Sequence, residues 1–462
     1  MRHSAKWSQQ VFGGAQLGDA RRSARLVRVA AQAAETPAGK VTEVFSQPAE
    51  RQAVYDFLES TAIAPERLTE ALARSSAYAC ASRERVLVVL DGTSLTVTDT
   101  RENKGLGRVG TFSAGATGAK VINALALTEA GTPIGIADQI WWTRQERVKK
   151  NVYRSGADRE SAHWRTAVER TTETFSKCAP DTKLHYLCDR EADAALLIHT
   201  VIRLGQEFTI RSNATRKVVG RRGRVGIRAV LAQRAAIATM EVAIPANSRR
   251  PARVARLLIR AAPLEVLMRD HHVKETRRVV LTYVWAREIG RRDGLDWMLV
   301  TNTKVPDAEA ACESVRRYTR RWRIEDFHKT WKSGLCKVEE TQLRSSGAII
   351  KWATILGAVA IRAEELRNQA RESPDEPATT ILSKDEIEAL VLLKTEIKRR
   401  TETVTAAGLT VVMAVRWIAE LGGYVGNKRS GPPGSITIGR GLERLEFAAR
   451  LIERLRATRK MR

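Results

Sequence analysis

The sequence predicts an α/β protein whose core carries a β-rich insertion and is flanked by a helical region at each end. Two short apolar runs are typical of buried strands, and each ends in an aspartate, Asp91 and Asp189. Residues from about 217 to 305 form a series of short β-rich runs separated by basic loops. Residues 1–82 and 373–462 instead place apolar residues at helical spacing.

The first region, residues 1–82, is expected to be a small helical domain. Asp19 supplies an N-cap for a helix over Ala20–Gln32, in which apolar residues lie on one face and arginines on the other. Two more helices are predicted over Pro48–Glu59 and from Pro65 towards Ala81. An arginine-lined helix suits the reading of a DNA end, and an ordinary basic surface helix is the alternative.

The central region, residues 83–372, begins with the buried strand Arg85–Leu90, after which Asp91 emerges. Two further strands are predicted at Val121–Thr128 and Ile134–Trp142, followed by a helix and a second strand that ends at Asp189. This order, with a later helix that carries Glu325, is that of a ribonuclease H-like fold, in which three carboxylates converge at one edge of the sheet. A turn at Asp91-Gly92 and a helix cap at Asp189 are the simpler interpretations.

The remaining elements complete the domain plan. Phe208–Ser212 is predicted to be the last core strand, and the insertion at about 217–305 separates it from the helix that carries Glu325. A long helix over Ile349–Gln369 closes the core. A proline-rich linker then leads to a helical region, residues 373–462, with helices predicted at the following ranges: Ser383–Arg400, Val404–Leu421 and Arg440–Arg456.

Charge indicates the class of partner. The chain has 78 Lys and Arg against 52 Asp and Glu, a formal net charge of +26, which favours a polyanion such as nucleic acid. We find no run of 18 or more apolar residues to cross a membrane and no signal-peptide core at the amino terminus, so no membrane is expected and the cytoplasm is predicted. The five cysteines are scattered and suit buried thiols better than disulfides or zinc.

The most informative stretch is Tyr318–Gly334, YTRRWRIEDFHKTWKSG. Arg321, Glu325 and Lys332 follow Tyr318 at offsets of three, seven and fourteen residues. A helix turns by about 100° per residue, so these four side chains are expected on one face. The Glu325 carboxylate can hold a divalent metal ion, and the positively charged side chains of Arg321 and Lys332 can hold phosphate oxygens. A solvated, salt-bridged helix is the alternative.

This spacing resembles the YREK signature of the bacterial cut-and-paste insertion-sequence transposases with a DDE triad. Two other segments are similar to that family: Trp7–Gln32, like its end-binding domain, with Arg21, Arg22 and Arg25 at the basic positions, and Cys188–Asp193, like its segment around the second catalytic aspartate. The resemblance to the family's dimerising tail is looser and covers 422–429.

The resemblance implies a mechanism. Asp91, Asp189 and Glu325 are expected to hold two Mg²⁺ ions, for which Mn²⁺ can substitute, and hard oxygen ligands suit both. The enzyme is expected to bind the inverted repeats of a transposon as a homodimer, to nick each end, to form a hairpin and to join the excised ends to target DNA.

Further DNA contacts follow from the same resemblance. They involve Tyr318, Arg321 and Lys332, together with Arg211 beside the active edge. Trp297 is expected to stack on a base turned out of the duplex during hairpin formation, although a tryptophan at a strand start is usually a packing residue.

Two other functions stay open. A transposase-derived repressor or inhibitor would bind DNA without cutting it, and the presence of all three carboxylates disfavours that reading. A ribonuclease H-like junction or RNA nuclease is disfavoured by the amino-terminal helical region and the complete signature.

Overall fold

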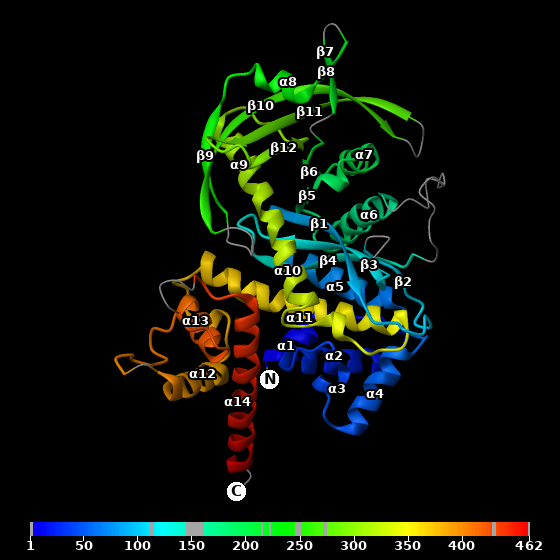
Figure 1. Cartoon of the computed structure of the whole chain (residues 1–462). Coiled ribbons are helices and arrows are strands. Elements are labelled where there is room, and N and C mark those ends of the chain that lie inside the picture. Colours follow the sequence, from blue (N-terminus) through cyan, green and yellow to red (C-terminus); the bar gives the residue numbers. More distant parts are fainter. Residues whose placement is uncertain are drawn as a thin grey trace.

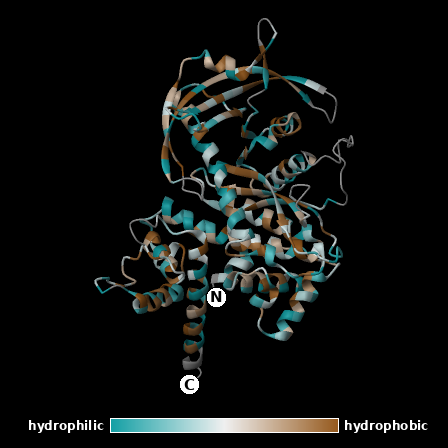
Figure 2. Cartoon of the chain, viewed as in Figure 1, coloured by the Kyte–Doolittle hydropathy of each residue, from teal (hydrophilic) through white to brown (hydrophobic). Residues whose placement is uncertain are grey.

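The computed structural model describes residues 3–110, 115–144, 161–213, 216–220, 223–244, 251–270, 275–398, 400–426 and 431–460. A large curved sheet occupies the upper part of the molecule, and helices from both ends of the chain lie beneath it (Figure 1). Hydrophobic residues concentrate in the strands and in the helices packed on them (Figure 2).

The amino-terminal region is helical, as predicted. Its elements are α1 (His3–Phe12), α2 (Ala20–Glu35), α3 (Val41–Val44), α4 (Pro48–Glu59) and α5 (Pro65–Cys80). The predicted cap is confirmed, because an Asp19 side-chain oxygen accepts a hydrogen bond of 2.7 Å from the Arg21 amide. Proline occupies the first turn of both α4 and α5, where its missing N–H costs nothing.

The central sheet is mixed. Its first strands are β1 (Arg85–Thr96), β2 (Gly107–Arg108), β3 (Thr117–Leu127), β4 (Pro133–Trp142), β5 (Lys183–Cys188) and β6 (Glu207–Arg211). Strand β1 pairs antiparallel with β3 and parallel with β5, and β6 is parallel to β5. Helices α6 (Ser161–Cys178) and α7 (Ala195–Arg203) connect β4 to β5 and β5 to β6. The predicted order of strands and helices is therefore confirmed for this part.

The β-rich insertion extends this sheet. Its elements are β7 (Lys217–Gly220), β8 (Gly223–Gly226), α8 (Ile227–Ala232), β9 (Ala238–Ile244), β10 (Arg253–Asp270), β11 (Glu275–Glu288) and β12 (Asp296–Thr301). Strand β12 pairs with β6, so one ten-stranded sheet runs through the described residues, and β7 and β8 pair with each other in a second, two-stranded sheet. Strand β10 continues past the end of its neighbour β9. Pro263 lies in that continuation, where only β11 pairs with β10 and no amide is needed on the other side.

Two consecutive segments return the chain to the core. Helix α9 (Ala308–Thr319) leads through a 3₁₀ turn (Arg320–Trp322) into α10 (Arg323–Lys332), and another 3₁₀ turn (Val338–Glu340) precedes α11 (Ser346–Glu372). Trp331 and Trp352 are fully buried, and their indole N–H groups donate to the carbonyls of Ala353 and Gly39, each at 2.8 Å.

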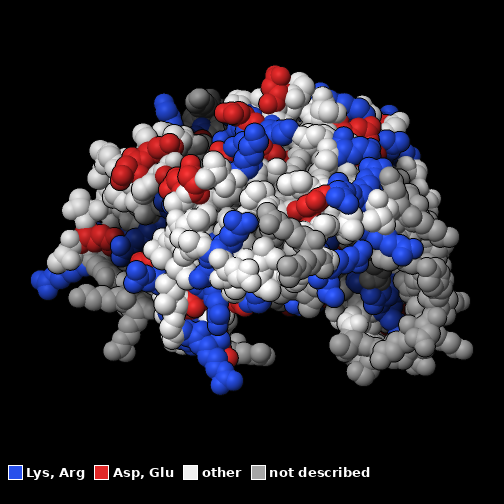
Figure 3. All heavy atoms as spheres, turned by 90° about the horizontal axis from the view of Figure 1, so that it is seen from above, with Lys and Arg blue, Asp and Glu red and all other residues white. Residues whose placement is uncertain are grey.

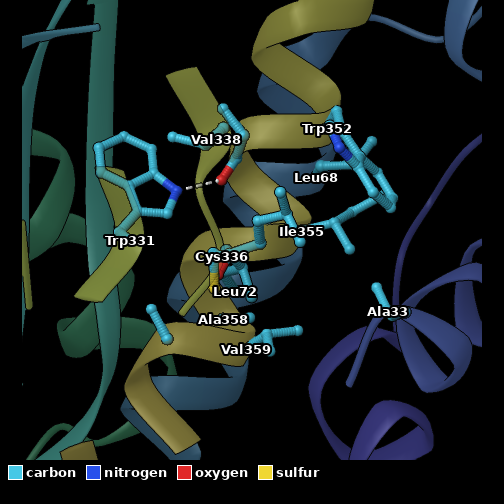
Figure 4. Close-up of a cluster of buried hydrophobic side chains, with 14 of the residues drawn as sticks. Ala33, Leu68, Leu72, Trp331, Cys336, Val338, Trp352, Ile355, Ala358 and Val359 are labelled. Atoms are coloured by element: carbon cyan, nitrogen blue, oxygen red, sulfur yellow. Dashed lines mark hydrogen bonds between the residues drawn. The ribbon is translucent and has the colours of Figure 1, made fainter. Parts of the chain in front are cut away.

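This cluster joins the amino-terminal region to the core. Figure 4 shows Ala33 of α2 and Leu68 and Leu72 of α5 around the same centre as Trp331 and Trp352. The amino-terminal helices were expected to form a domain of their own. In the structure they share a hydrophobic core with α10 and α11. Helix α11 is buried along most of its length and forms the centre of that core. Replacing Trp331 or Trp352 by alanine should lower the free energy of unfolding by about 3–5 kcal/mol.

Helix α11 is the one helix within the described ranges that is long and apolar enough to cross a membrane. Most of it, 83% of the apolar window, is buried inside the protein. That burial identifies α11 as the central core helix. All five cysteines are free in the structure, and only Cys178 is partly exposed.

The carboxy-terminal region has its own hydrophobic cluster. It consists of a 3₁₀ turn (Ala378–Thr380), α12 (Lys384–Ile397), α13 (Val411–Leu421) and α14 (Ser435–Lys460). Helix α13 begins later than the expected Val404. Helix α14 also reaches the other regions, because Glu446 pairs with Arg362 of α11 and Arg450 pairs with Glu35 of α2, each at 2.5 Å.

Candidate active site

Asp91 lies on β1, a core strand that pairs with β3 on one side and with β5 on the other. Val86–Leu90 are fully buried, and Asp91 is the first polar residue after this run, with its side chain 19% exposed. Burial raises the pKa of Asp91 to about 7, Arg321 opposes that rise, and the charges of Asp189 and Glu325 add to it. Asp91 therefore lies within electrostatic reach of the other two predicted carboxylates.

Asp189 follows β5, the parallel neighbour of β1. Leu90 and Cys188 are partners in the ladder, so the residues after them, Asp91 and Asp189, emerge at the same edge of the sheet. An Asp189 oxygen also accepts a hydrogen bond of 2.8 Å from the Glu191 amide and caps a short 3₁₀ turn. The cap was the simpler interpretation of this residue, and it leaves the other carboxylate oxygen available at the edge.

Glu325 lies in the first turn of α10, and its side chain is 57% exposed. Arg321 Nη2 donates to Glu325 Oε1 at 2.5 Å, while Arg321 Nη1 is 3.5 Å from Asp91 Oδ2. The guanidinium is 11% exposed, and although burial opposes its charge, Tyr318, Glu325 and Asp91 raise the pKa of Arg321 above its usual range. Arg321 thus lies as a fixed positive charge between two of the three carboxylates.

The signature segment was expected to be one continuous α-helix, and the structure differs. Helix α9 ends at Thr319, the 3₁₀ turn follows, and α10 begins at Arg323. Trp297 of β12 contacts the ring of Tyr318, near the end of α9, and the ring of Trp322, the last residue of the 3₁₀ turn, with centroids 5.4 and 5.7 Å away. The three rings form one aromatic cluster at this turn.

Trp297 and Tyr318 are buried in this structure, at 4% and 3% exposure. The indole therefore has no open face for a base, and the packing interpretation describes Trp297 in this conformation. Base stacking would require the indole to leave the cluster. Arg211, the last residue of β6, lies near the same tyrosine: burial raises the pKa of Tyr318, and the positive charges of Arg321 and Arg211 lower it.

Lys332 lies at the far end of α10 and also faces β1. Its Nζ donates a long hydrogen bond of 3.5 Å to Thr93 Oγ1 and is 3.4 Å from Glu339 Oε1. Thr93 is two residues beyond Asp91, on the same face of the strand. The structure thus brings Tyr318, Arg321 and Glu325 together beside Asp91, and places Lys332 further along the same strand.

The fit of this site to divalent cations can be judged from its donors. Carboxylate oxygens, which Asp91, Asp189 and Glu325 supply, are the hard ligands that Mg²⁺ and Mn²⁺ use. Nowhere in the described ranges do three or more Asp, Glu, His or Cys side chains lie close enough to hold an ion. The donor chemistry fits, and closing the site requires Arg321 to leave Glu325 and Asp91.

Three polar residues that lie near the carboxylates were not predicted from the sequence. Asn123 of β3 and Gln139 of β4 are 0% and 2% exposed, and His328 follows Glu325 by three residues on α10. Asn123 interrupts an otherwise apolar run, Val121–Leu127, and that interruption was the available signal.

The predicted DNA-reading arginines lie on α2. Arg21 is exposed, and Arg22 and Arg25 are half-buried. Residues 4–63, which span α1 to α4 and include these arginines, match the family model described as transposase DNA-binding. The match supports a transposase that binds DNA, and hence a DNA-processing enzyme.

Proposed function

We propose that this chain is a DDE transposase of the bacterial cut-and-paste type with the YREK signature. It binds the inverted repeats at the ends of its element, excises the element by nicking and hairpin formation, and joins the 3′ ends to target DNA. The observation that carries the proposal is that Asp91 and Asp189 emerge at one edge from adjacent parallel strands, while Glu325 on α10 shares Arg321 with Asp91.

The strand order supports a ribonuclease H-like core. The order β4-β3-β1-β5-β6, with β3 and β4 antiparallel to their neighbours and β1, β5 and β6 parallel, places both aspartates at one edge of the sheet. The insertion then returns the chain to that edge through α9 and α10, which carry Glu325. This arrangement supports a single site built from residues far apart in sequence.

The chemistry follows from the side chains. Asp91, Asp189 and Glu325 would hold two Mg²⁺ ions, which supply an activated water or 3′ hydroxyl and stabilise the leaving oxygen of an in-line displacement. Arg321 and Lys332 would bind phosphate oxygens of the scissile strand, with Tyr318 and Arg211 beside them. A phosphate that draws Arg321 away from Glu325 would at the same time free the two carboxylates that it now neutralises.

Charge supports DNA as the partner. The chain carries a formal net charge of +26, and Lys and Arg side chains are spread over much of the face that is seen from above in Figure 3. The arginines of α2 lie in the segment that matches the DNA-binding family. The proposed partners are therefore the inverted repeats and target DNA, and the proposed location is the cytoplasm.

A homodimer is proposed for the synaptic complex, and α14 is its candidate surface. Phe447, Leu451 and Leu455 recur every four residues and are 57%, 45% and 65% exposed. Residues spaced in this way share one helix face, and an exposed apolar stripe of this kind is typical of self-association.

The test uses Asp91→Asn, Asp189→Asn and Glu325→Gln in the full-length protein, with duplex DNA that carries the element's own end. Each variant should lose cleavage in Mg²⁺ while it still binds the end, because binding rests on basic residues elsewhere. Asp326→Asn is the matched control, since this neighbouring carboxylate faces Arg367 of α11 and should be dispensable for cleavage. Cleavage at the normal rate by any of the first three variants removes that residue from the site.

The same experiment separates the second candidate, a transposase-derived repressor. Such a protein would bind the end with the wild-type sequence and cut it in neither Mg²⁺ nor Mn²⁺.

A further inference from the structure

A row of polar side chains crosses three neighbouring strands at the level of the proposed active site. In the ladders Asp91 of β1 lies opposite Asn123 of β3, and Asn123 lies opposite Gln139 of β4. Residues directly opposite one another in antiparallel pairs point to the same face of the sheet. That face is the one that packs against α10, because Asp91 contacts Arg321 there.

Hydrogen bonds connect Gln139 to Asn123 and Asn123 to His328, with the donor on the Gln139 side in the first of them. Gln139 Nε2 donates to Asn123 Oδ1 at 2.7 Å, and Asn123 Nδ2 lies 3.0 Å from His328 Nε2 on α10. Because the Asn123 oxygen already accepts from Gln139, its amide nitrogen faces the imidazole and can only donate. His328 Nε2 must then accept, which requires a neutral ring with its proton on Nδ1.

The surroundings of His328 agree with a neutral ring. Burial lowers the pKa of His328 to about 3, and the positive charges of Lys332 and Arg321 lower it further. The imidazole therefore keeps the same hydrogen-bonding role throughout the neutral pH range.

The contact fixes the helix that carries Glu325. His328 lies one turn beyond Glu325 and seven residues beyond Arg321, so the three side chains share a face. Other polar contacts from this segment to β1 are Arg321 with Asp91 and Lys332 with Thr93. Both of those use cations that the proposed function assigns to DNA phosphates, whereas the contact between Asn123 and His328 does not depend on a charged group.

We propose that Gln139, Asn123 and His328 form a positioning network that sets the place of Glu325 relative to Asp91 when DNA draws Arg321 and Lys332 away. This inference rests on the proposed function and adds to it three residues that touch neither substrate nor metal. Gln139 orients Asn123, Asn123 holds His328, and His328 holds α10 against the sheet.

The experiment compares His328→Leu with His328→Gln in the full-length protein. Glutamine can place an acceptor oxygen near the position of Nε2, and leucine fills similar space without one. His328→Leu should cut a saturating end duplex on the order of 10²-fold more slowly, since a displacement of about 1 Å can have that effect. It should also bind Mn²⁺ roughly 10-fold more weakly in the presence of the duplex, as measured by electron paramagnetic resonance of free Mn²⁺. His328→Gln should recover most of the cleavage rate and most of the Mn²⁺ affinity. Binding of the end duplex should be unchanged in either variant.

Two further variants make the result decisive. Gln139→Met removes the donor that orients Asn123 and should slow cleavage by about 10-fold, which keeps the proposal testable if His328→Leu does not fold. Tyr186→Phe removes a buried hydrogen bond of 2.7 Å to Thr172 of α6, on the other face of the sheet, and should cut at the wild-type rate.

The network is overturned if His328→Leu and Gln139→Met cut and bind Mn²⁺ like the wild type. It is also overturned if leucine and glutamine at position 328 are equally impaired, because the acceptor would then be irrelevant. Asp91→Asn in the same series distinguishes this from failure of the proposed function. If Asp91→Asn cuts normally, the proposed active site is wrong, whatever the network variants do.

Discussion

Arg321 donates a hydrogen bond of 2.5 Å to Glu325, one helical turn further along the signature segment. The same guanidinium is 3.5 Å from Asp91, so in the absence of DNA it neutralises part of the charge of the proposed metal site. The arginine and a divalent cation therefore compete for the same carboxylates. Phosphate binding by Arg321 would relieve this competition.

Removing that guanidinium should strengthen metal binding by the DNA-free protein. Arg321→Met is expected to bind Mn²⁺ at least about 10-fold more tightly than the wild type, a difference of ~1.4 kcal/mol, because the carboxylates lose their internal cation. Electron paramagnetic resonance of free Mn²⁺ measures it. Arg317→Met is the control, since that arginine pairs with Glu129 and Glu313 instead. Equal affinity of the wild type and Arg321→Met would show that Arg321 does not occupy the site.

The packing of Trp297 leads to a prediction about stability. Trp297→Ala should lower the free energy of unfolding by about 3–5 kcal/mol, because the indole is buried against Tyr318 and Trp322. Trp297→Phe should lower the free energy of unfolding much less than Trp297→Ala does. Phe447→Ala, at a side chain that is 57% exposed, controls for loss of an aromatic ring. Urea unfolding checks this, and an unchanged midpoint for Trp297→Ala would argue that the indole leaves the cluster readily enough to meet a base.

Much of the candidate site could be predicted because strand ends leave clear marks in a sequence. Asp91 and Asp189 each terminate an apolar run, and parallel pairing of β1 and β5 then brings them together. The position of Arg321 between carboxylates could not be predicted, since helical spacing gives a shared face and not which partner a long side chain chooses. The 3₁₀ turn before α10 packs against Trp297, a residue of a distant strand, and that contact leaves no mark in the local sequence.

The sequence was least informative where tertiary contacts decide the outcome. The shared core of α2, α5 and α11 has no local signature, so the amino-terminal region looked like an independent domain. The length of β10 follows from its pairing with β11, which outweighs Pro263. Asn123 stood out as a polar residue in an apolar run, but its partners on β4 and α10 are visible only in the folded chain.

The neutral state of His328 makes stability depend on pH. In the unfolded chain its pKa is about 6.5, and in the folded chain burial, Lys332 and Arg321 lower the pKa to about 3. Between these values the unfolded chain binds the extra proton, so this contribution is complete above about pH 6.5 and is lost progressively towards pH 3. A pKa difference changes the free energy of unfolding by about 1.36 kcal/mol per pH unit. Because the His328 side chain is partly exposed, we expect somewhat less: lowering the pH from 8 to 4.5 should reduce the free energy of unfolding by roughly 2 kcal/mol through His328.

This prediction is checked by urea unfolding of the wild type and His328→Gln at pH 8 and pH 4.5. Between pH 8 and pH 4.5, the free energy of unfolding of His328→Gln should fall by roughly 2 kcal/mol less than that of the wild type. His199→Gln, on α7, is the control for replacing a histidine. The same acid sensitivity in the wild type and His328→Gln would mean that position 328 does not titrate between the two states.

The arginines of α2 should set part of the salt dependence of end binding. Each phosphate contact contributes about 0.9 to the slope of log affinity against log salt, so replacing Arg21, Arg22 and Arg25 by alanine should flatten the slope by up to ~2.7. Fluorescence anisotropy with an end duplex between 50 and 300 mM salt, roughly the range in which counterion release dominates, measures it. Arg67→Ala, on α5 and paired with Glu70, should leave the slope unchanged. A slope in the triple variant that equals the wild-type slope would place the DNA elsewhere.

The exposed stripe of α14 should hold two copies of the chain together at a DNA end. Leu451→Asp with Leu455→Asp places two charges on a face whose side chains are 45% and 65% exposed, so folding of the single chain should be unaffected. In a dimer the same charges would be buried without partners, which costs several kcal/mol and should leave the complex with one protein per duplex. Sedimentation of the protein with an end duplex measures the stoichiometry, and Val254→Asp, at a β10 residue that is 62% exposed, is the matched control. Paired end complexes formed equally well by the α14 double variant would exclude this stripe as the dimer contact.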